Sequence, residues 1–366
     1  MIPATVHVSA EVEYDVVIGI NLLDSLNGMV SGADRVAILH APTQRTLAAQ
    51  IASIQRDGGH RVTEIELPDA EEAKSSSVVE MCWGTLGQAG FTRSDAIISV
   101  GGGATTDVAG FVAATWLRGI RVVHVPTTLL GMVDAAIGGK TGINTAAGKN
   151  LVGSFHSPVG VLCDISSLTS LPRRDLVAGM AEVVKVGFAR DVSILADVRQ
   201  APDQALDPTS ELLPDLIRRA VQVKADVVSD DFRETSATSV SGKLGREVLN
   251  YGHTFGHAIE RNEGYRWRHG DAVAVGMVYV AELSHLTGHL SAEGLAEHRT
   301  ILELIGLPTT YAAGHWESLL SAMSVDKKAR GSLLRFVILD EIGSPSALQG
   351  PPPEAMRAAY DRISAS

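Results

Sequence analysis

The sequence predicts an α/β N-terminal domain with a mostly parallel sheet, followed by an all-α C-terminal domain. Up to about residue 165, short runs rich in β-branched residues alternate with helical patterns, which is typical of βαβ units. From Pro172 onward these runs fade and helical periodicity dominates. The chain has 366 residues, 45% of them hydrophobic, which is enough for two ordinary cores. We therefore expect one domain over residues 1–170 and a second over residues 171–366.

The expected elements follow from local composition. Short apolar runs predict strands, and apolar residues at helical spacing predict helices. The Ser/Thr/Gly-rich segment 235–245 is expected to form a mobile loop between two helices, and an amphipathic helix is expected after the prolines at 351–353. The predicted strands lie at 36–39, 96–100, 122–125 and 159–162, and the predicted helices at 108–117, 176–188, 212–228, 249–260, 272–286 and 293–305.

Charge and cysteine content exclude several classes of protein. The chain has 42 acidic and 31 basic residues, a formal charge of −11, which argues against a protein that coats nucleic acid or anionic membranes. Cys82 and Cys163 belong to no CxxC pair, so neither a disulfide framework nor a thiolate zinc site is expected. The first residues lack the basic and apolar regions of a signal peptide. We expect a soluble protein in the reducing cytoplasm.

A glycine triplet, Gly101-Gly102-Gly103, follows the strand predicted at 96–100 and precedes a predicted helix. Glycines at this position let the backbone approach a pyrophosphate, whose charge the amides at the helix N-terminus favour. The spacing differs from GxGxxG, so an ordinary Rossmann dehydrogenase is not indicated. The strand-turn-helix context favours a nucleotide site, and a plain tight turn is the alternative.

A second glycine-rich segment contains the Gly-Lys-Thr tripeptide of a Walker A loop at residues 139–141. The position where that loop requires its first glycine is occupied by Asp134, so a site for nucleoside triphosphates is excluded. Lys140, Lys149 and Asn150 are interleaved with glycines, and lysines suit phosphate as point charges. We interpret the segment as a phosphate site, with a structural loop as the alternative.

Histidines and a glutamate in the second half have the composition of a metal site. His253 and His257 lie at i,i+4 on one face of a predicted helix, and His269 follows further along the chain. Residue 254 is a threonine in place of the general-base glutamate of HExxH, which excludes a zincin site. Glu182 is a candidate carboxylate ligand, with Lys185 one turn away on the same face. Two histidines with one carboxylate leave open positions for a chelating substrate, and a structural histidine pair is the alternative.

Several long segments resemble, in the same order, the 3-dehydroquinate synthase family. They extend over residues 101–119, 125–144, 148–156, 179–185 and 249–260. The resemblance implies a dehydroquinate synthase-like fold, in which a Rossmann-like NAD-binding domain precedes an all-α domain that binds metal and substrate. It also implies NAD and a divalent metal, zinc or cobalt, as cofactors, and a homodimer.

The resemblance further assigns roles to individual residues. The implied metal ligands are Glu182, His253 and His269, and His257 becomes a neighbour in the site rather than a ligand. Arg118 resembles an arginine that reaches the phosphate site of the neighbouring subunit. The implied substrate residues are Asp134, Lys140, Asn150, Lys185, Lys224, Arg246, Asn250, His257 and Lys327. The implied NAD-binding residues are Asp69, Lys74, Gly103, Ala104, Thr105, Thr106, Asp107, Thr127, Thr128, Lys140, Lys149, Ser167, Leu168, Thr169 and Ser170.

The reaction that the resemblance implies converts 3-deoxy-D-arabino-heptulosonate 7-phosphate to 3-dehydroquinate and phosphate, in the shikimate pathway of aromatic amino acid biosynthesis. NAD oxidises the substrate transiently, phosphate leaves, the hydride returns, and the opened ring closes in an aldol step. The metal polarises a substrate oxygen, whereas Arg246 suits a planar carboxylate and the lysines suit phosphate. Because NAD ends as it began, no net redox turnover is expected.

Two other functions remain as alternatives. Another sugar-phosphate cyclase, of the amino-dehydroquinate or 2-deoxy-scyllo-inosose type, would share the metal and NAD machinery. Substrates without a carboxylate have no use for Lys224 together with Arg246. The presence of both residues therefore disfavours the 2-deoxy-scyllo-inosose type but not the amino-dehydroquinate type. A glycerol-dehydrogenase-like oxidoreductase would accumulate NADH and would need fewer anion-binding residues.

The chain departs from the family pattern before Arg246, where it has an added Ser/Thr/Gly-rich segment. Arg246 and Asn250 are expected at i,i+4 on the helix that carries His253, so we expect the site to tolerate the insertion. One lysine that some relatives carry near the site is absent, and Arg190 is a candidate substitute.

Overall fold

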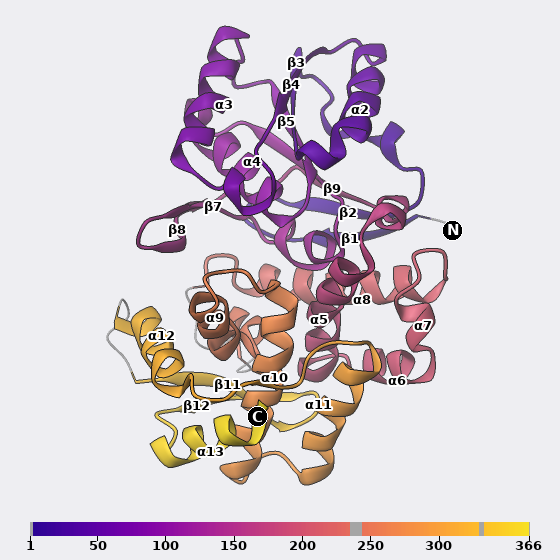
Figure 1. The fold of residues 1–366 in the computed structure, drawn as a ribbon. Coiled ribbons are helices and arrows are strands. Elements are labelled where there is room, and N and C mark those ends of the chain that lie inside the picture. The colour runs from indigo at the N-terminus through magenta and orange to yellow at the C-terminus, as the bar shows by residue number, and fades with distance from the viewer. Residues whose placement is uncertain (1–2, 235–243, 329–332, 366) are drawn as a thin grey trace. The chain divides into compact units, whose positions relative to one another are not determined.

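The computed structural model of the chain describes residues 3–234, 244–328 and 333–365, with the side chains of 325–328 left out. The chain divides into two compact units (Figure 1). The first contains Met1–Leu171 and Lys224–Arg233, and the second contains Pro172–Val223 and Glu234–Ser366. The segment Lys224–Arg233 thus groups with the first unit, although the sequence-based division at 170/171 assigned it to the second. Within the described ranges, no helix is long and apolar enough to cross a membrane.

The first unit is built on a seven-stranded sheet whose order is β1-β2-β9-β6-β5-β3-β4. Only β1 is antiparallel to its neighbour in this sheet. The central strands β3, β5 and β6 are buried almost throughout, as expected for a parallel sheet covered on both faces. The strands are β1 (Ala4–Val8), β2 (Tyr14–Gly19), β3 (Arg35–His40), β4 (Arg61–Glu66), β5 (Ala96–Gly101), β6 (Arg121–Pro126) and β9 (Gly160–Asp164).

The strands predicted near residues 36, 96, 122 and 159 correspond to β3, β5, β6 and β9, whereas β1, β2 and β4 were not predicted. The reason is burial: β1 alternates between exposed and buried positions and β4 has a single buried residue, so neither has the continuous apolar run of the central strands.

Helices cover both faces of this sheet (Figure 1). Alternate residues of each central strand belong to two separate cores, because successive side chains of a strand point to opposite faces. The core that contains Leu39 is closed by α3 (Ser76–Gln88) and α4 (Gly103–Thr115). The core that contains Ile38 is closed by α1 (Leu26–Met29) and α2 (Arg45–Asp57).

A hairpin follows β6 in the chain and carries several of the predicted site residues. Its strands are β7 (Lys140–Thr145) and β8 (Gly148–Phe155), which pair antiparallel. The hairpin packs closely on α4, because a Cβ at Gly110 of α4 would lie 2.4 Å from Cγ2 of Thr141. This glycine therefore sets how near the hairpin lies to the helix.

The second unit is helical, as predicted, and is arranged around α10 (His269–Leu286). This helix is buried on nearly all sides and contacts α5, α9, α11 and α13. The other helices of the unit are α5 (Arg173–Ala189), α6 (Val192–Gln200), α7 (Pro202–Ala205), α8 (Leu212–Asp230, up to Val223), α9 (His253–Asn262), α11 (Ala292–Leu304), α12 (Trp316–Lys328) and α13 (Pro353–Ile363).

The expectation that the second domain is entirely α-helical needs one addition. β11 (Arg335–Glu341) and β12 (Ser344–Gln349) form an antiparallel hairpin that contacts α10, and β10 (Tyr311–Ala312) pairs with β13 (Ser364–Ala365). The sequence pattern did not reveal the hairpin, because its apolar run at residues 336–339 is too short to distinguish the period of a helix from that of a strand.

The helix predicted over residues 249–260 is wrong as a single element. The structure has a 3-10 helix, η7 (Arg246–Asn250), and then the separate helix α9 that begins at His253. The break falls at Gly252, whose φ of 77° lies in the left-handed region. A Cβ there would lie 2.8 Å from Cγ of Met277, so both conformation and space require glycine. Arg246 and Asn250 therefore do not share a helix with His253.

Candidate active site

The predicted NAD-binding residues follow the carboxyl ends of the parallel strands in the first unit. Residues 69–74 come after β4, 103–107 after β5, and 127–128 after β6, while β9 leads into the 3-10 helix η6 (Ile165–Ser170). β4 and β5 lie on opposite sides of β3, so the chain reverses its direction across the sheet between them. Ligands of α/β proteins bind at such a switch point, outside the carboxyl ends of the strands.

The glycine triplet opens α4 and brings its N-terminus close to neighbouring backbone. A Cβ at Gly103 would lie 3.0 Å from Cβ of Ala135, and one at Gly102 would lie 3.2 Å from Cγ2 of Thr128. Gly102 is the N-cap residue, and as a glycine it has no side chain that could cap the first-turn amides. These amides can therefore bind an anion, and the absence of Cβ atoms lets Ala135 and Thr128 pack closely against the N-terminus of α4.

A buried lysine connects three predicted residues of the first unit. Nζ of Lys74 contacts Oδ2 of Asp107 in α4 and Oδ1 of Asn150 in β8. Burial raises the pKa of Asp107 to about 6, although Lys74 opposes this. Asn150 has a φ of 56°, which is uncommon for a residue other than glycine. Its backbone amide donates to Oδ1 of Asn144, and this bond helps to hold that conformation. Lys149 lies near Glu71, with Nζ 3.6 Å from Oε1.

The side chains of the remaining predicted NAD residues bond mainly to backbone groups of residues nearby in the chain. Ser167 Oγ donates to the Asp164 carbonyl over 2.7 Å, and Thr169 Oγ1 donates to the Ser166 carbonyl over 2.7 Å. Leu168 is buried. These bonds hold η6 in one conformation. Ser170 Oγ donates to the Ser167 carbonyl, also in η6.

Two predicted NAD residues follow β6. The Thr127 amide donates to the Gly101 carbonyl, and Thr128 Oγ1 accepts from the Gly131 amide.

The predicted substrate residues of the first unit lie apart along the chain. Asp134 lies in a π-helical turn, η5 (Gly131–Ala135), and both its carbonyl and its carboxylate contact Nζ of Lys224 near the end of α8. Lys140, the first residue of β7, is exposed. Arg118 is exposed in the 3-10 turn η4 (Trp116–Arg118), where both Leu117 and Arg118 have positive φ values of 48° and 68°.

The predicted metal ligands converge in the second unit. Glu182 comes from α5, and His253 and His269 are the first residues of α9 and α10. Their ligand atoms all lie within 4.8 Å of one another. Oε1 of Glu182 lies 3.5 Å from Nε2 of His253 and 3.6 Å from Nε2 of His269. A tetrahedral ion with ligands at about 2.1 Å separates its ligand atoms by about 3.4 Å, so the spacing suits zinc.

The outer nitrogen of each histidine has its own partner. Nδ1 of His253 donates to the Tyr251 carbonyl over 3.1 Å, and Nδ1 of His269 lies 3.0 Å from Oε2 of Glu260. These bonds leave each Nε2 directed at Glu182. Oε1 of Glu182 is buried and accepts no hydrogen bond within the described part of the chain. A buried carboxylate oxygen that accepts no hydrogen bond and lies near two imidazole nitrogens suits the binding of a cation.

Electrostatics keep the carboxylate of this cluster ionised. Burial opposes ionisation, but Lys185 and the two histidines hold the pKa of Glu182 well below its usual range. Burial, with Lys185, lowers the pKa of His253 to about 3. Burial also acts to lower the pKa of His269, but the carboxylates of Glu182 and Glu260 more than offset it and raise the value to about 10.

The other predicted residues of the second unit lie on several elements, and some of them lie close in sequence to the predicted metal ligands. Lys185 is buried; its Nζ contacts Oε2 of Glu182 and donates to the Leu249 carbonyl over 2.6 Å, which agrees with the expected one-turn spacing. Arg246 is buried in η7, and Asn250 Nδ2 lies 3.4 Å from Oε1 of Glu234. The Lys327 side chain lies outside the described residues, as does most of the inserted segment. Arg190 donates from Nη2 to the Leu244 carbonyl.

The i,i+4 pair His253 and His257 does not form a shared metal site in the described residues. Their rings meet edge to face, with centroids 5.2 Å apart. His257 instead groups with Glu260 and His269 in a second cluster of candidate ligand atoms. His257 is exposed, whereas His253 is buried, so the two histidines have different environments despite sharing a helix face.

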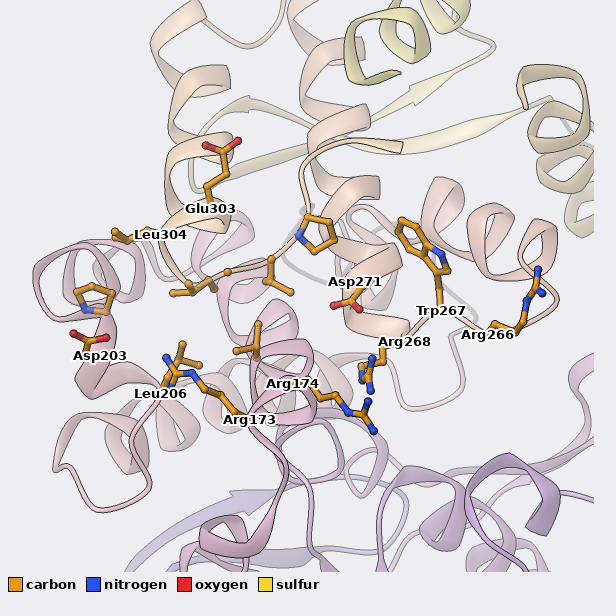
Figure 2. Close-up of a pocket in the computed structure, with 16 residues that line it drawn as sticks. Arg173, Arg174, Asp203, Leu206, Arg266, Trp267, Arg268, Asp271, Glu303 and Leu304 are labelled. Atoms are coloured by element: carbon orange, nitrogen blue, oxygen red, sulfur yellow. The ribbon is translucent and has the colours of Figure 1, made fainter. Parts of the chain in front are cut away.

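An open cavity of about 1060 Å³ in the second unit is separate from the predicted metal ligands (Figure 2). Its lining includes Arg173 and Arg174 of α5, Arg268 and Asp271 near the start of α10, and the apolar side chain of Leu206. No predicted metal, NAD or substrate residue lines it. The candidate site therefore rests on the chemistry of its residues and not on the size of a cavity.

Glu260 was not identified from the sequence as part of the candidate metal site. It lies on the buried side of α9, three residues after His257, and it bonds the predicted ligand His269. A glutamate among the apolar positions of an amphipathic helix is unusual and could have indicated it. The partner of that glutamate could not be inferred, since it lies on another helix.

Two solved structures similar to this chain are sugar-phosphate cyclases. A 2-epi-5-epi-valiolone synthase from Streptomyces hygroscopicus, solved with NAD+ and Zn2+, is 25% identical with a TM-score of 0.87, covering 96% of this chain and 97% of that one. A 2-deoxy-scyllo-inosose synthase, solved with carbaglucose-6-phosphate, NAD+ and Co2+, is 26% identical with a TM-score of 0.84, covering 98% and 100%. The fold and the Glu/His/His cluster thus define an enzyme with the dehydroquinate synthase-like fold.

Sequence comparison identifies the family within this class. Residues 64–178 match the family model for the 3-dehydroquinate synthase N-terminal domain, and residues 179–329 match that for the C-terminal domain. A 3-dehydroquinate synthase of Rhodococcus opacus is 54% identical over 361 residues, which is 99% of this chain and 95% of the relative. The chain belongs to the 3-dehydroquinate synthase family.

Proposed function

We propose that the protein converts 3-deoxy-D-arabino-heptulosonate 7-phosphate to 3-dehydroquinate and phosphate, using NAD and a divalent metal. The observation that carries this proposal is the cluster in which Oε1 of Glu182 lies, without a hydrogen bond from the described residues, between Nε2 of His253 and Nε2 of His269. Membership of the 3-dehydroquinate synthase family across nearly the whole chain supplies the identity of the reaction.

Glu182, His253 and His269 are the proposed metal ligands. Two imidazole nitrogens and one carboxylate oxygen suit zinc or cobalt, and they leave positions for substrate oxygens. When bound, the metal would polarise a substrate oxygen as a Lewis acid, and NAD would accept and return a hydride. Lys185 keeps Glu182 ionised, because its ammonium contacts the second carboxylate oxygen.

NAD is proposed to bind the first unit at the carboxyl ends of its parallel strands. The amides that open α4 at Gly103 would hold the pyrophosphate, and residues 69–74, 127–128 and 167–170 would contact the rest of the cofactor. Lys74 and Asp107 already contact each other, so this part of the proposed site is preorganised before the cofactor arrives.

The proposed substrate residues divide by chemistry. The buried guanidinium of Arg246 would bind the substrate carboxylate, and Asn250 would donate a neutral hydrogen bond. Lysines 140 and 224 would bind the substrate as point charges, with Asp134 orienting Lys224. The roles of Asn150, His257 and Lys327 in substrate binding rest on the family resemblance alone.

A homodimer is part of the proposal. Arg118 is exposed on a turn with two successive non-glycine residues at positive φ, a conformation that costs energy and persists where a structure needs it. We propose that this turn presents Arg118 to the phosphate site of a second subunit. Sedimentation velocity should give a dimer, and loss of Arg118 should raise KM for the phosphate-bearing substrate.

A cytoplasmic location is also proposed. Cys82 and Cys163 are both buried free thiols, and burial raises the pKa of each. Such thiols are unreactive and do not form the disulfides that extracellular proteins favour. Fractionation of cells that express the chain tests this location.

The activity is tested with the purified protein, NAD, Zn2+ or Co2+ and the heptulosonate phosphate. Equal amounts of phosphate and 3-dehydroquinate are expected, with NADH present only at trace level. Phosphate release without dehydroquinate, or NADH formed in proportion to substrate consumed, would contradict the proposal. The amino-heptulosonate analogue and glucose 6-phosphate, assayed in parallel, are expected to react much more slowly. A preference for either of them would favour the corresponding cyclase.

A further inference from the structure

His298 is a fully buried histidine of α11 that lies outside the set of residues assigned above. Its Nδ1 lies 2.7 Å from the Gly294 carbonyl, and its Nε2 lies 2.7 Å from the Tyr251 hydroxyl. Its ring stacks on Phe188, with centroids 3.8 Å apart and planes 8° from parallel. Both nitrogens and one ring face have fixed partners, so the ring has a single orientation.

These partners also determine where the hydrogens lie. A carbonyl can only accept, so Nδ1 of His298 carries the hydrogen that bonds Gly294. Burial lowers the pKa of His298 to about 4, so the ring is neutral at pH 7 and Nε2 accepts from the Tyr251 hydroxyl. Tyr251 is itself fully buried, which makes this bond costly to lose.

Tyr251 connects this bond to a proposed metal ligand. Its backbone carbonyl accepts from Nδ1 of His253 over 3.1 Å. Tyr251 precedes the left-handed Gly252, so it lies outside α9, and its position depends on its own contacts more than on the helix. The hydroxyl of Tyr251 is held by His298 at one end, and its carbonyl orients His253 at the other.

The stacked face of His298 reaches the element that carries the carboxylate ligand. Phe188 and Glu182 both belong to α5. His298 therefore contacts the helix of one ligand directly and the residue that orients another ligand through a hydrogen bond. An apolar residue of the same size would fill this core space without the cost of burying a polar ring, so packing alone does not explain a histidine here.

We propose that His298 is a positioning residue for the metal ligand His253, acting through Tyr251. His298 sets the place of Tyr251, and the Tyr251 carbonyl fixes the Nδ1–H form of His253, which leaves Nε2 for the ion beside Glu182. The inference rests on the metal site of the proposed function. Losing a direct hydrogen-bond partner of a ligand typically lowers metal affinity by about 10- to 100-fold, and because His298 lies one contact further out, its loss should have an effect at the lower end of this range.

The test compares metal affinities of full-length variants, stripped of metal and titrated with Co2+ and Zn2+ against a chromogenic chelator. His298→Phe keeps the ring stacked on Phe188 but removes both hydrogen bonds, and its Co2+ affinity is expected to fall by up to about 10-fold, because His298 lies one contact beyond the direct partner of the ligand. His298→Gln retains an acceptor near Nε2 and should recover most of the affinity. His285→Gln is the matched control, because this histidine of α10 also bonds a carbonyl but contacts no proposed ligand among the described residues.

A double variant separates positioning from stability. Tyr251→Phe combined with His298→Phe removes both partners of the buried bond, so much of the lost stability should return while the Co2+ affinity stays low. The visible absorption of bound Co2+ should also change in His298→Phe, since it reports the geometry of the ligands. If His298→Phe does not fold, Tyr251→Phe tests the same bond.

Two results overturn the inference. One is wild-type Co2+ affinity and spectrum in folded His298→Phe or Tyr251→Phe, and the other is wild-type affinity in the double variant. Failure of the underlying proposal looks different, because the wild-type protein would then bind neither Zn2+ nor Co2+ stoichiometrically.

Discussion

His269 and Glu260 form a carboxylate–histidine pair, with Nδ1 of the histidine 3.0 Å from Oε2 of the glutamate. Glu260 is buried near the end of α9, and His269 is the first residue of α10. The pair therefore joins the two helices whose first residues are the proposed histidine ligands. The carboxylate also fixes which nitrogen of His269 remains for an ion.

Replacing Glu260 by Gln should lower the affinity for Zn2+ and Co2+ by about 10-fold, and replacing it by Ala by up to about 100-fold, because the imidazole loses basicity and orientation. Chelator competition measures both. Glu263→Gln is the control, because this neighbouring glutamate accepts from Tyr311 and is not in the cluster. Equal affinities of Glu260→Ala and wild type would contradict the assignment.

Glu182→Gln should abolish stoichiometric metal binding and turnover while the protein remains folded. The change removes the anionic ligand but keeps the side-chain volume, and Lys185 retains its bond to the Leu249 carbonyl. Metal content of the purified protein and product formation are the measurements. Glu282→Gln provides a matched buried control: it loses its ion pairs with Arg299 and Arg362, so it should lose stability but retain metal. Metal retained by Glu182→Gln would exclude this residue as a ligand.

Arg246→Ala should raise KM for the heptulosonate phosphate by roughly 10- to 100-fold, since a hydrogen-bonded charge pair is worth about 1.5–3 kcal/mol. Arg246→Lys should recover part of this, because a lysine keeps the charge but not the bidentate geometry. Arg335→Ala tests specificity: Arg335 pairs with the neighbouring Glu247, so its loss should affect stability more than KM. Steady-state kinetics distinguish the three variants, and an unchanged KM in Arg246→Ala would remove it from the site.

Gly252→Ala should destabilise the protein more than Gly264→Ala. Both glycines have positive φ, 77° and 59°, so each substitution costs about 1–2 kcal/mol of backbone strain. A Cβ at Gly264 would meet nothing within 4 Å, whereas one at Gly252 would lie 2.8 Å from Cγ of Met277. Overpacking should add about 1–3 kcal/mol at Gly252. Denaturant unfolding measures the difference, and equal losses would show that the break before α9 is not tightly packed.

Stability should fall in acid because of His124. Burial lowers the pKa of this histidine, which bonds Ser99, to about 3 from 6.5. Below pH 6.5 the unfolded chain takes up a proton that the folded chain does not, so the stabilisation present above pH 6.5 is lost as the pH falls towards 3. The slope reaches about 1.4 kcal/mol per pH unit. Urea unfolding from pH 7 to 5 should show a smaller slope in His124→Gln, and an unchanged slope would contradict the shift.

Much of the fold could be predicted because its signals are local. The central strands are buried on both faces and form continuous apolar runs, and the long helices repeat at the helical period. The edge strands β1 and β4 were not predicted, because only two of the five residues of β1 and one of the six of β4 are buried, and neither strand forms a continuous apolar run. The prediction of a single helix over 249–260 was wrong for a different reason: Gly252 has a left-handed conformation that breaks the helix, and Met277 on another helix leaves no space for a side chain there.

The sequence by itself determined the class of each half, the glycine-rich turn before α4 and, through family resemblance, the candidate ligands Glu182, His253 and His269. Only the tertiary structure decided which side chains support them: Glu260 behind His269, and Tyr251 with His298 behind His253. The physical reason is that motifs are contiguous in the chain, whereas a hydrogen bond between helices depends on where packing places two distant residues. The chemistry of a ligand is therefore visible in sequence, but its orientation is not.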